Sequence, residues 1–121
     1  AMHLEYVASR VDHARGTTSA ATSFPDLFME LLSPGDISER ALRFHHGVAR
    51  LLAAQLRAAA EAAGAHTIGV TGGCALNRLL MRFLQDELAD YHLLTHHHVP
   101  ANDGGLSLGQ AVAGRRYASN Q

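Results

Sequence analysis

Residues 70–78 form the first of two glycine-rich segments whose residue types could do chemistry. They read Val-Thr-Gly-Gly-Cys-Ala-Leu-Asn-Arg and stand where a strand pattern ends and a helical pattern begins. Glycines at such a turn let a ligand approach the main chain, and the amides that open a helix attract anions. Asn77 is expected about one turn into the helix, where its amide would reach a ribose or a base. A plain strand-to-helix turn that needs two small residues explains the same pattern.

The second segment, residues 99–105, reads Val-Pro-Ala-Asn-Asp-Gly-Gly. Asp103 has two interpretations. It is either the cap of the following helix, or a hard oxygen ligand for a metal ion or for magnesium on a nucleotide. A helix N-terminus favours the ionised carboxylate in both cases. The sequence leaves the choice open.

Histidine is the third feature, with nine residues in a chain of 121. His92 and His96 are four residues apart on an extended segment, which separates them by about 13 Å, too far for one metal ion. We interpret the run at 96–98 as solvated surface. His45, beside Phe44, is expected to face the core and make a buried hydrogen bond. A histidine-based metal-binding protein is an alternative that depends only on the histidine count.

Composition narrows the class of protein. The length fits one domain, and 47% hydrophobic with 17% charged residues indicates a globular chain. A formal net charge of −1 gives no basic field for nucleic acid, and the single cysteine excludes an internal disulfide. We see no apolar run long enough to cross a membrane and no signal peptide, so the cytoplasm is the expected location. Residues 1–2 are interpreted as an addition ahead of the natural segment.

The spacing of apolar residues predicts the helices and strands that must position these residues. In the first half we predict a helix over 3–11, a loop over 12–23, a helix from 24 that stops within 33–36, and a long helix over 37–63. Asp36 or Ser38 caps the long helix and Gly64 ends it. Its core stripe is predicted to be Ile37, Ala41, Phe44, Val48, Leu51 with Leu52, Leu56 and Ala59.

The second half alternates between strands and helices. We predict a strand over 67–71 that is buried on both sides, a helix over 75–89, a strand over 91–95, a loop over 96–103, and a last helix from 104 or 105 to 117. This order indicates an α/β fold with a long helix on a small parallel β-α-β-α layer. Two strands are too few for a free-standing sheet. Either a strand is misread, or the missing strands lie outside this chain, in a longer protein or an oligomer.

Three segments together resemble the C-terminal end of the hydrogenase maturation carbamoyltransferase family HypF. They are Phe-His-His-Gly-Val-Ala at 44–49, Thr-Gly-Gly-Cys-Ala-Leu-Asn-Arg-Leu-Leu at 71–80, and Val-Pro-Ala-Asn-Asp-Gly-Gly-Leu-Ser-Leu-Gly-Gln-Ala at 99–111. Antibiotic O-carbamoyltransferases and tRNA threonylcarbamoyl transferases share these pieces more loosely. The resemblance implies that residues 3–121 are a single C-terminal subdomain, a partial lobe of the actin-like ATPase (ribonuclease H-like) fold.

The resemblance also implies a set of functional residues. Gly72, Gly73 and Asn77 would bind the adenine nucleotide, Asn102 would flank it, and Asp103 would be a ligand of an iron or zinc ion. The family forms carbamoyl-adenylate from carbamoyl phosphate and magnesium-dependent ATP. It then passes the carbamoyl group to a cysteine of a partner protein, HypE.

Two departures from the family pattern bear on activity. In the family, the turn usually continues with Val-Phe-Gln, whereas this chain has Cys-Ala-Leu at 74–76. The family's other metal ligands are two histidines on a helix, and this sequence supplies no such histidine pair. We therefore expect one wall of an active site, with no catalytic residue within this chain and no turnover by the chain alone. The expected partners are the rest of the transferase domain, a HypE-like acceptor and a second copy. The alternative is a stand-alone, non-catalytic nucleotide-binding or interaction module.

Overall fold

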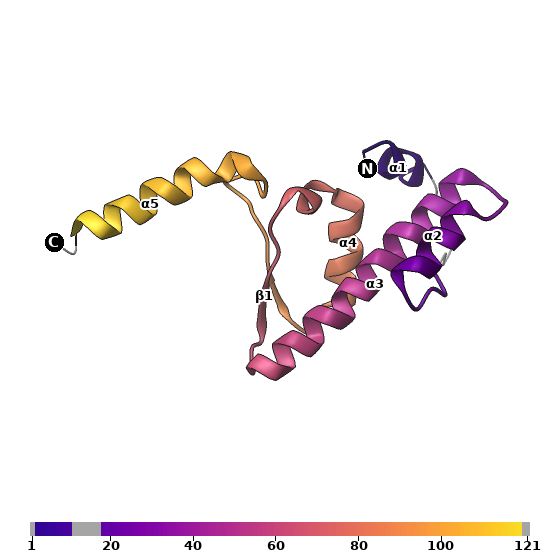
Figure 1. The fold of residues 1–121 in the computed structure, drawn as a ribbon, viewed down its shortest axis with the longest axis horizontal. Helices are drawn as coiled ribbons and strands as arrows, with labels where there is room; N and C mark the ends of the chain where they lie inside the picture. The colour runs from indigo at the N-terminus through magenta and orange to yellow at the C-terminus, as the bar shows by residue number, and fades with distance from the viewer. Residues whose placement is uncertain (1, 11–17, 120–121) are drawn as a thin grey trace.

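The structure, a computed structural model, describes residues 2–10 and 18–119, and Figure 1 shows its arrangement. Five α-helices, two strands and two short 3-10 turns follow one another along these residues. They are α1 (Met2–Ala8), α2 (Phe24–Leu32), α3 (Ile37–Ala63), β1 (Thr67–Gly69), η2 (Gly73–Leu76), α4 (Arg78–Glu87), β2 (His92–Leu94), η3 (Asp103–Gly105) and α5 (Leu106–Ser119). The predicted order is confirmed. The predicted end of the first helix, at residue 11, lies outside the described residues, as does the part of the predicted loop over 12–17.

The long helix α3 is set by its two end signals. The Asp36 carboxylate accepts hydrogen bonds from the backbone amides of Ser38 and Glu39, at 2.9 and 3.0 Å, so Asp36 and not Ser38 is the N-cap. Gly64 adopts φ 62°, ψ 29° and closes the helix with backbone bonds to Ala60 and Glu61. The helix therefore begins and ends where the sequence predicts.

The buried face of α3 differs from the predicted stripe. Ile37 and Ala59 are exposed, and Ala41 is the fully buried member of that stripe. The residues that are buried on this helix are mostly small: Ala41, Leu42, His45, Gly47, Ala49, Ala53 and Ala60. The reason is that α1, α2 and α4 all pack on α3, and close approach of several helices selects residues with little side-chain volume. The prediction of a single amphipathic stripe is therefore wrong for this helix, which three other helices contact.

The two strands pair in parallel, with Thr67 opposite His92, Ile68 opposite Leu93 and Gly69 opposite Leu94. Helix α4 makes the crossover between them and packs on α3. The prediction of a longer first strand buried on both sides is wrong, because only Ile68 of β1 is buried. Within the described residues the sheet has two strands, which leaves most of its surface uncovered.

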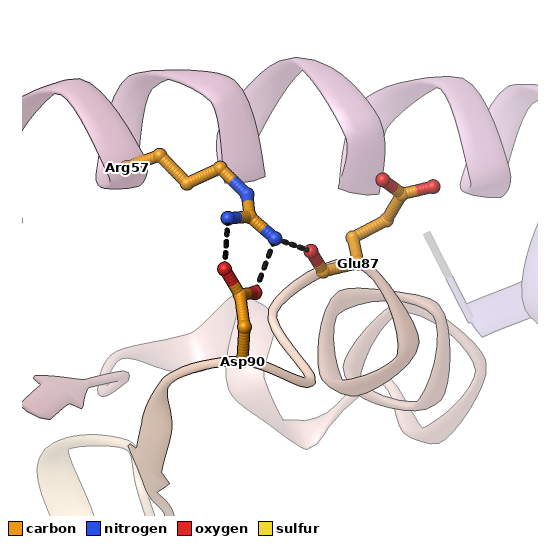
Figure 2. A network of polar contacts seen from close by, with 3 residues as sticks. All are labelled: Arg57, Glu87 and Asp90. Atoms are coloured by element: carbon orange, nitrogen blue, oxygen red, sulfur yellow. Dashed lines mark hydrogen bonds and ion pairs between the residues drawn. The ribbon is translucent and has the colours of Figure 1, made fainter. Parts of the chain in front are cut away.

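A polar clamp joins α3 to the turn before β2, and Figure 2 shows it. The Arg57 guanidinium donates to both carboxylate oxygens of Asp90, and to the Glu87 carbonyl at 2.7 Å. It also lies 5.2 Å from the centre of the Tyr91 ring. The hydrogen bond from Arg57 lowers the pKa of Asp90, and the same bond raises the pKa of Arg57. The clamp fixes where β2 begins relative to α3.

Helix α5 extends away from the other elements (Figure 1), and none of its residues is buried. Leu106, Leu108, Val112 and Tyr117 are each more than half exposed. Among the described residues, no helix is long and apolar enough to cross a membrane.

Candidate functional site

The two glycine-rich segments meet at the carboxyl ends of the paired strands. The Gly72 amide donates to the Ala101 carbonyl at 2.8 Å, and the Thr71 hydroxyl donates to the same oxygen at 3.2 Å. Since that hydroxyl hydrogen is used, His96 Nε2 is the donor in its 3.1 Å contact with Thr71 Oγ1. Ligands of open α/β sheets bind at this edge. Segments thirty residues apart in the sequence thus form one edge of a candidate site.

Gly72 makes the turn after β1 sharp, because it adopts φ 101°, ψ 170°, a conformation closed to residues with a side chain. The chain then enters η2, whose first two amides, on Gly73 and Cys74, have no hydrogen-bond partner among the described residues. Both residues are exposed. These two amides are the donors that the turn offers to a ligand.

Asn77 is the N-cap of α4, not a residue one turn into a helix, because η2 precedes α4 and delays its start to Arg78. The side-chain oxygen Oδ1 of Asn77 accepts from the Leu80 backbone amide at 2.8 Å. The side-chain nitrogen Nδ2 of Asn77 lies 3.0 Å from Nε2 of His45 on α3. The Asn77 side chain is therefore held from both sides.

Glu5 of α1 takes the remaining donors at the start of α4. Its carboxylate accepts from the Arg78 amide at 2.8 Å and from the Leu79 amide at 3.5 Å. The anion expected at this helix start is thus supplied by the chain itself. An external anion at this edge would contact the amides of η2 instead. No sequence signal identifies Glu5, since 73 residues separate it from Arg78.

A cavity of about 580 Å³ lies between α1, α3 and the η2–α4 turn. Its volume falls within the roughly 300–1,000 Å³ usual for small-molecule sites. The walls are mainly apolar, with a few polar groups among them. The lining residues are Leu4, Glu5, Phe44, His45, Val48, Gly73, Cys74, Leu76, Asn77 and Leu80. Gly73 and Asn77, which the sequence singles out, both line it.

Of the two roles that the sequence leaves open for Asp103, the structure bears on the helix cap. The Asn102 side chain caps η3 by accepting from the Gly104 amide at 3.1 Å. Asp103 is exposed, and its carboxylate has no hydrogen bond or ion pair with any described residue. The interpretation of Asp103 as a helix cap is therefore wrong, because the helical turn begins one residue earlier than that role requires.

Close packing explains the glycine pair after Asp103. A Cβ on Gly105 would lie 2.9 Å from the Pro100 carbonyl oxygen, and one on Gly104 would lie 3.0 Å from the Pro100 ring. The loop folds back on itself here with room for hydrogen only. This packing holds Asp103 at the edge formed by the strands.

The histidines occupy separate places. His45 is 5% exposed and hydrogen-bonded on both nitrogens, as the sequence predicts. His46 contacts the Phe83 ring edge-on and lies 3.5 Å from the Glu87 carboxylate. Residues 96–98 are exposed. No group of three His, Cys, Asp or Glu side chains in the described part of the chain is arranged to hold a metal ion.

Two relatives of this chain are HypF-type carbamoyltransferases. The sequence is 41% identical over 98 residues to carbamoyltransferase HypF of Rhodobacter capsulatus, which covers 79% of this chain and 13% of that protein. It is 32% identical over 126 residues to carbamoyltransferase HypF2 of Cupriavidus necator, covering 91% of this chain and 16% of the relative. The chain thus spans less than a fifth of the length of these relatives.

The fold matches that of a solved structure. HypF of T. kodakarensis superimposes with a TM-score of 0.75 over 98% of this chain and 17% of that chain, at 23% identity. The family model for the second subdomain of the Kae1-like domain of carbamoyltransferases matches residues 1–110. The chain therefore belongs to the HypF carbamoyltransferase family, in which it corresponds to this second subdomain.

Proposed function

We propose that this chain is the part of a HypF-type carbamoyltransferase that supplies one wall of the transfer site, within an actin-like ATPase lobe. The observation that carries the proposal is the junction of the two glycine-rich segments through Gly72 and Ala101 at the strand ends. The hydrogen bond between these segments supports the proposal, because ligands of open α/β sheets bind at the carboxyl ends of the strands.

The nucleotide half of the proposal uses groups within this chain. The apolar cavity of about 580 Å³ suits a base, and the free amides of Gly73 and Cys74 suit a phosphate or a ribose hydroxyl. Asn77 lines the cavity, and Asn102 stands beside the turn through the Gly72–Ala101 contact. The proposed ligand is ATP with magnesium, or the adenylate formed from it.

The metal half requires groups from outside this chain. An exposed carboxylate with no partner among the described residues, as on Asp103, is a suitable oxygen ligand for an iron or zinc ion. A bound ion of this kind would act as a Lewis acid at the carbamoyl group. Because the described residues offer no three-ligand group, the remaining ligands would come from the rest of the transferase domain.

In the complete protein, we propose, carbamoyl phosphate, water and ATP yield a carbamoyl-adenylate with release of phosphate and pyrophosphate. A cysteine thiol of a HypE-like partner then takes the carbamoyl group with release of AMP, during hydrogenase maturation in the cytoplasm. This chain binds and orients the nucleotide and lends one metal ligand. A second candidate is a stand-alone nucleotide-binding module. The observation that favours it is that the cavity and both free amides belong to this chain alone.

A cavity-filling variant tests the nucleotide half. Val48 lines the cavity from α3, so Val48→Phe places a ring where the base is proposed to lie, while Ala54→Phe adds the same ring at an exposed site on the same helix. In calorimetric titration of the complete protein with magnesium-ATP, Val48→Phe should weaken binding at least tenfold and Ala54→Phe should not change it. An unliganded melting temperature close to wild type confirms that each variant is folded. Equal ATP affinity of Val48→Phe and wild type would refute the proposed site.

A further inference from the structure

His45 is a buried side chain that the proposed chemistry does not yet use, and it contacts the half-buried side chain of Asn77. His45 lies on α3 and is 5% exposed, and both residues line the cavity beside the glycine turn. The His45 Nδ1 atom is 2.7 Å from the Ala41 carbonyl oxygen, and Nε2 is 3.0 Å from the Asn77 amide nitrogen. Both ring nitrogens are therefore occupied.

The direction of every hydrogen bond in this chain of contacts is determined. The Ala41 carbonyl only accepts, so Nδ1 of His45 carries the proton of the neutral ring. The Leu80 amide only donates, so the Asn77 atom facing it is the oxygen. The Asn77 nitrogen then faces His45 and donates to the unprotonated Nε2.

These bonds leave the Asn77 amide half used. A primary amide has two N–H donors and two acceptor lone pairs, and His45 and Leu80 occupy one of each. One donor and one lone pair remain, in a fixed orientation, on a side chain that lines the cavity. Without the acceptor on His45, only the hydrogen bond from Leu80 to the side-chain oxygen would hold the Asn77 amide group. The remaining N–H donor of Asn77 would then no longer have a fixed orientation.

We propose that His45 is a positioning residue for nucleotide binding, which acts by fixing the orientation of the Asn77 amide toward the ligand. This proposal rests on the proposed function, since it needs a nucleotide in the cavity. His45 lines the cavity, but both of its ring nitrogens have partners within the chain, so it acts on the ligand by way of Asn77 and is not itself a catalytic residue.

Two substitutions at His45 separate positioning from simple packing. The amide of His45→Asn ends at the distance of Nδ1 from the main chain, so this variant keeps the bond to Ala41 and loses the one to Asn77. The amide of His45→Gln reaches the distance of Nε2, so it keeps an acceptor for Asn77 and loses the bond to Ala41. Each variant loses one hydrogen bond, so the two should have similar melting temperatures.

The first readout needs no nucleotide. In the ¹⁵N spectrum of the complete protein, the Asn77 side-chain amide, assigned by its disappearance in Asn77→Asp, should stay near its wild-type position in His45→Gln and move in His45→Asn. Equal movement in both variants would overturn the claim that His45 orients Asn77.

The second readout is affinity for magnesium-ATP by calorimetric titration. His45→Gln should bind within about threefold of wild type, and His45→Asn at least tenfold more weakly. Equal affinities in the two variants, with a wild type that binds, would overturn the positioning role and leave the proposed function standing. A wild type that fails to bind ATP would overturn the proposed function, and this inference with it.

Discussion

Neighbouring residues in the two glycine-rich segments have different structural roles. Asn102 uses its side chain to cap η3, while the carboxylate of Asp103 beside it has no partner in the described part of the chain. Gly72 is needed for its positive φ angle, whereas Gly105 is needed because a Cβ there would be too close to Pro100 and Val99. Residues of one type therefore differ in what a substitution would do, and the glycines give the clearest contrast.

Gly105→Ala and Gly109→Ala should change stability in opposite directions. A Cβ at Gly105 would meet the Pro100 carbonyl oxygen and Val99, both at 2.9 Å, whereas a Cβ at Gly109 in α5 meets nothing within 4 Å. Overpacking against backbone costs about 1–3 kcal/mol, and Gly→Ala in an exposed helix gains about 0.5–1 kcal/mol. Urea unfolding of both variants measures the difference. A Gly105→Ala variant as stable as wild type would show that the loop has room to shift.

At the scale of elements, α3 organises the molecule, because α1, α2 and α4 all pack on it. The sequence predicts this helix well, since Asp36 and Gly64 are local signals that act within a few residues of the ends. Its buried face is predicted poorly, because that face depends on three neighbouring helices. The sequence also predicts the start of α4 too early, at residue 75. The turn η2 occupies residues 73–76, and Asn77 caps the helix that follows it.

The same distinction applies to the candidate site. Gly72, Gly73, Asn77, Asn102 and Asp103 are visible in the sequence because glycine pairs with polar neighbours form recognisable motifs. Glu5 and the His45–Asn77 bond join residues 73 and 32 positions apart, so no local pattern reveals them. Tertiary contacts between motifs are what the structure adds to the sequence.

The clamp between α3 and the turn before β2 should make stability depend on pH. The hydrogen bond from Arg57 lowers the pKa of Asp90 in the folded state, so its stabilising effect is complete above the unfolded pKa and is lost as pH falls through the lowered value. Asp90→Asn should therefore be less stable than wild type at neutral pH, and this difference should shrink as the pH falls below the ordinary Asp pKa of about 3.9. Urea unfolding across this range measures the difference.

Asp86→Asn is the matched control, since Asp86 is exposed on α4 and has no hydrogen bond or ion pair with any described residue. It should follow the wild-type curve closely at every pH. A stability gap for Asp90→Asn that stayed constant on acidification would contradict an ionic clamp and indicate a packing effect.

At the scale of the whole molecule, much apolar surface has no partner among the residues that the structure describes. Helix α5 buries none of its residues, and the described strands form a sheet of two. Surfaces of this kind are typical of protein contacts. In the complete protein we expect the rest of the transferase domain to cover them, and the isolated chain should use them to bind a second copy.

Light scattering on the isolated chain tests this expectation. The mass should exceed 13.0 kDa and approach twice that value as concentration rises. Replacing Leu108 and Val112, both exposed and four residues apart on α5, by Gln should shift the mass toward the monomer. A wild-type chain that remains at 13.0 kDa at high concentration would contradict the expectation.

The central claim is that Asp103 is a metal ligand of a carbamoyl transfer site, and one substitution in the complete protein tests it most directly. Asp103→Asn removes the charge but leaves the cap on Asn102 untouched, so the melting temperature should stay within about 2 °C of wild type. We predict that the purified variant loses bound iron or zinc by elemental analysis and loses carbamoyl transfer to its acceptor protein. Asn102→Ala is the control, since it should lower stability by about 1 kcal/mol while metal content is retained. Full metal content and full transfer in Asp103→Asn would contradict the claim.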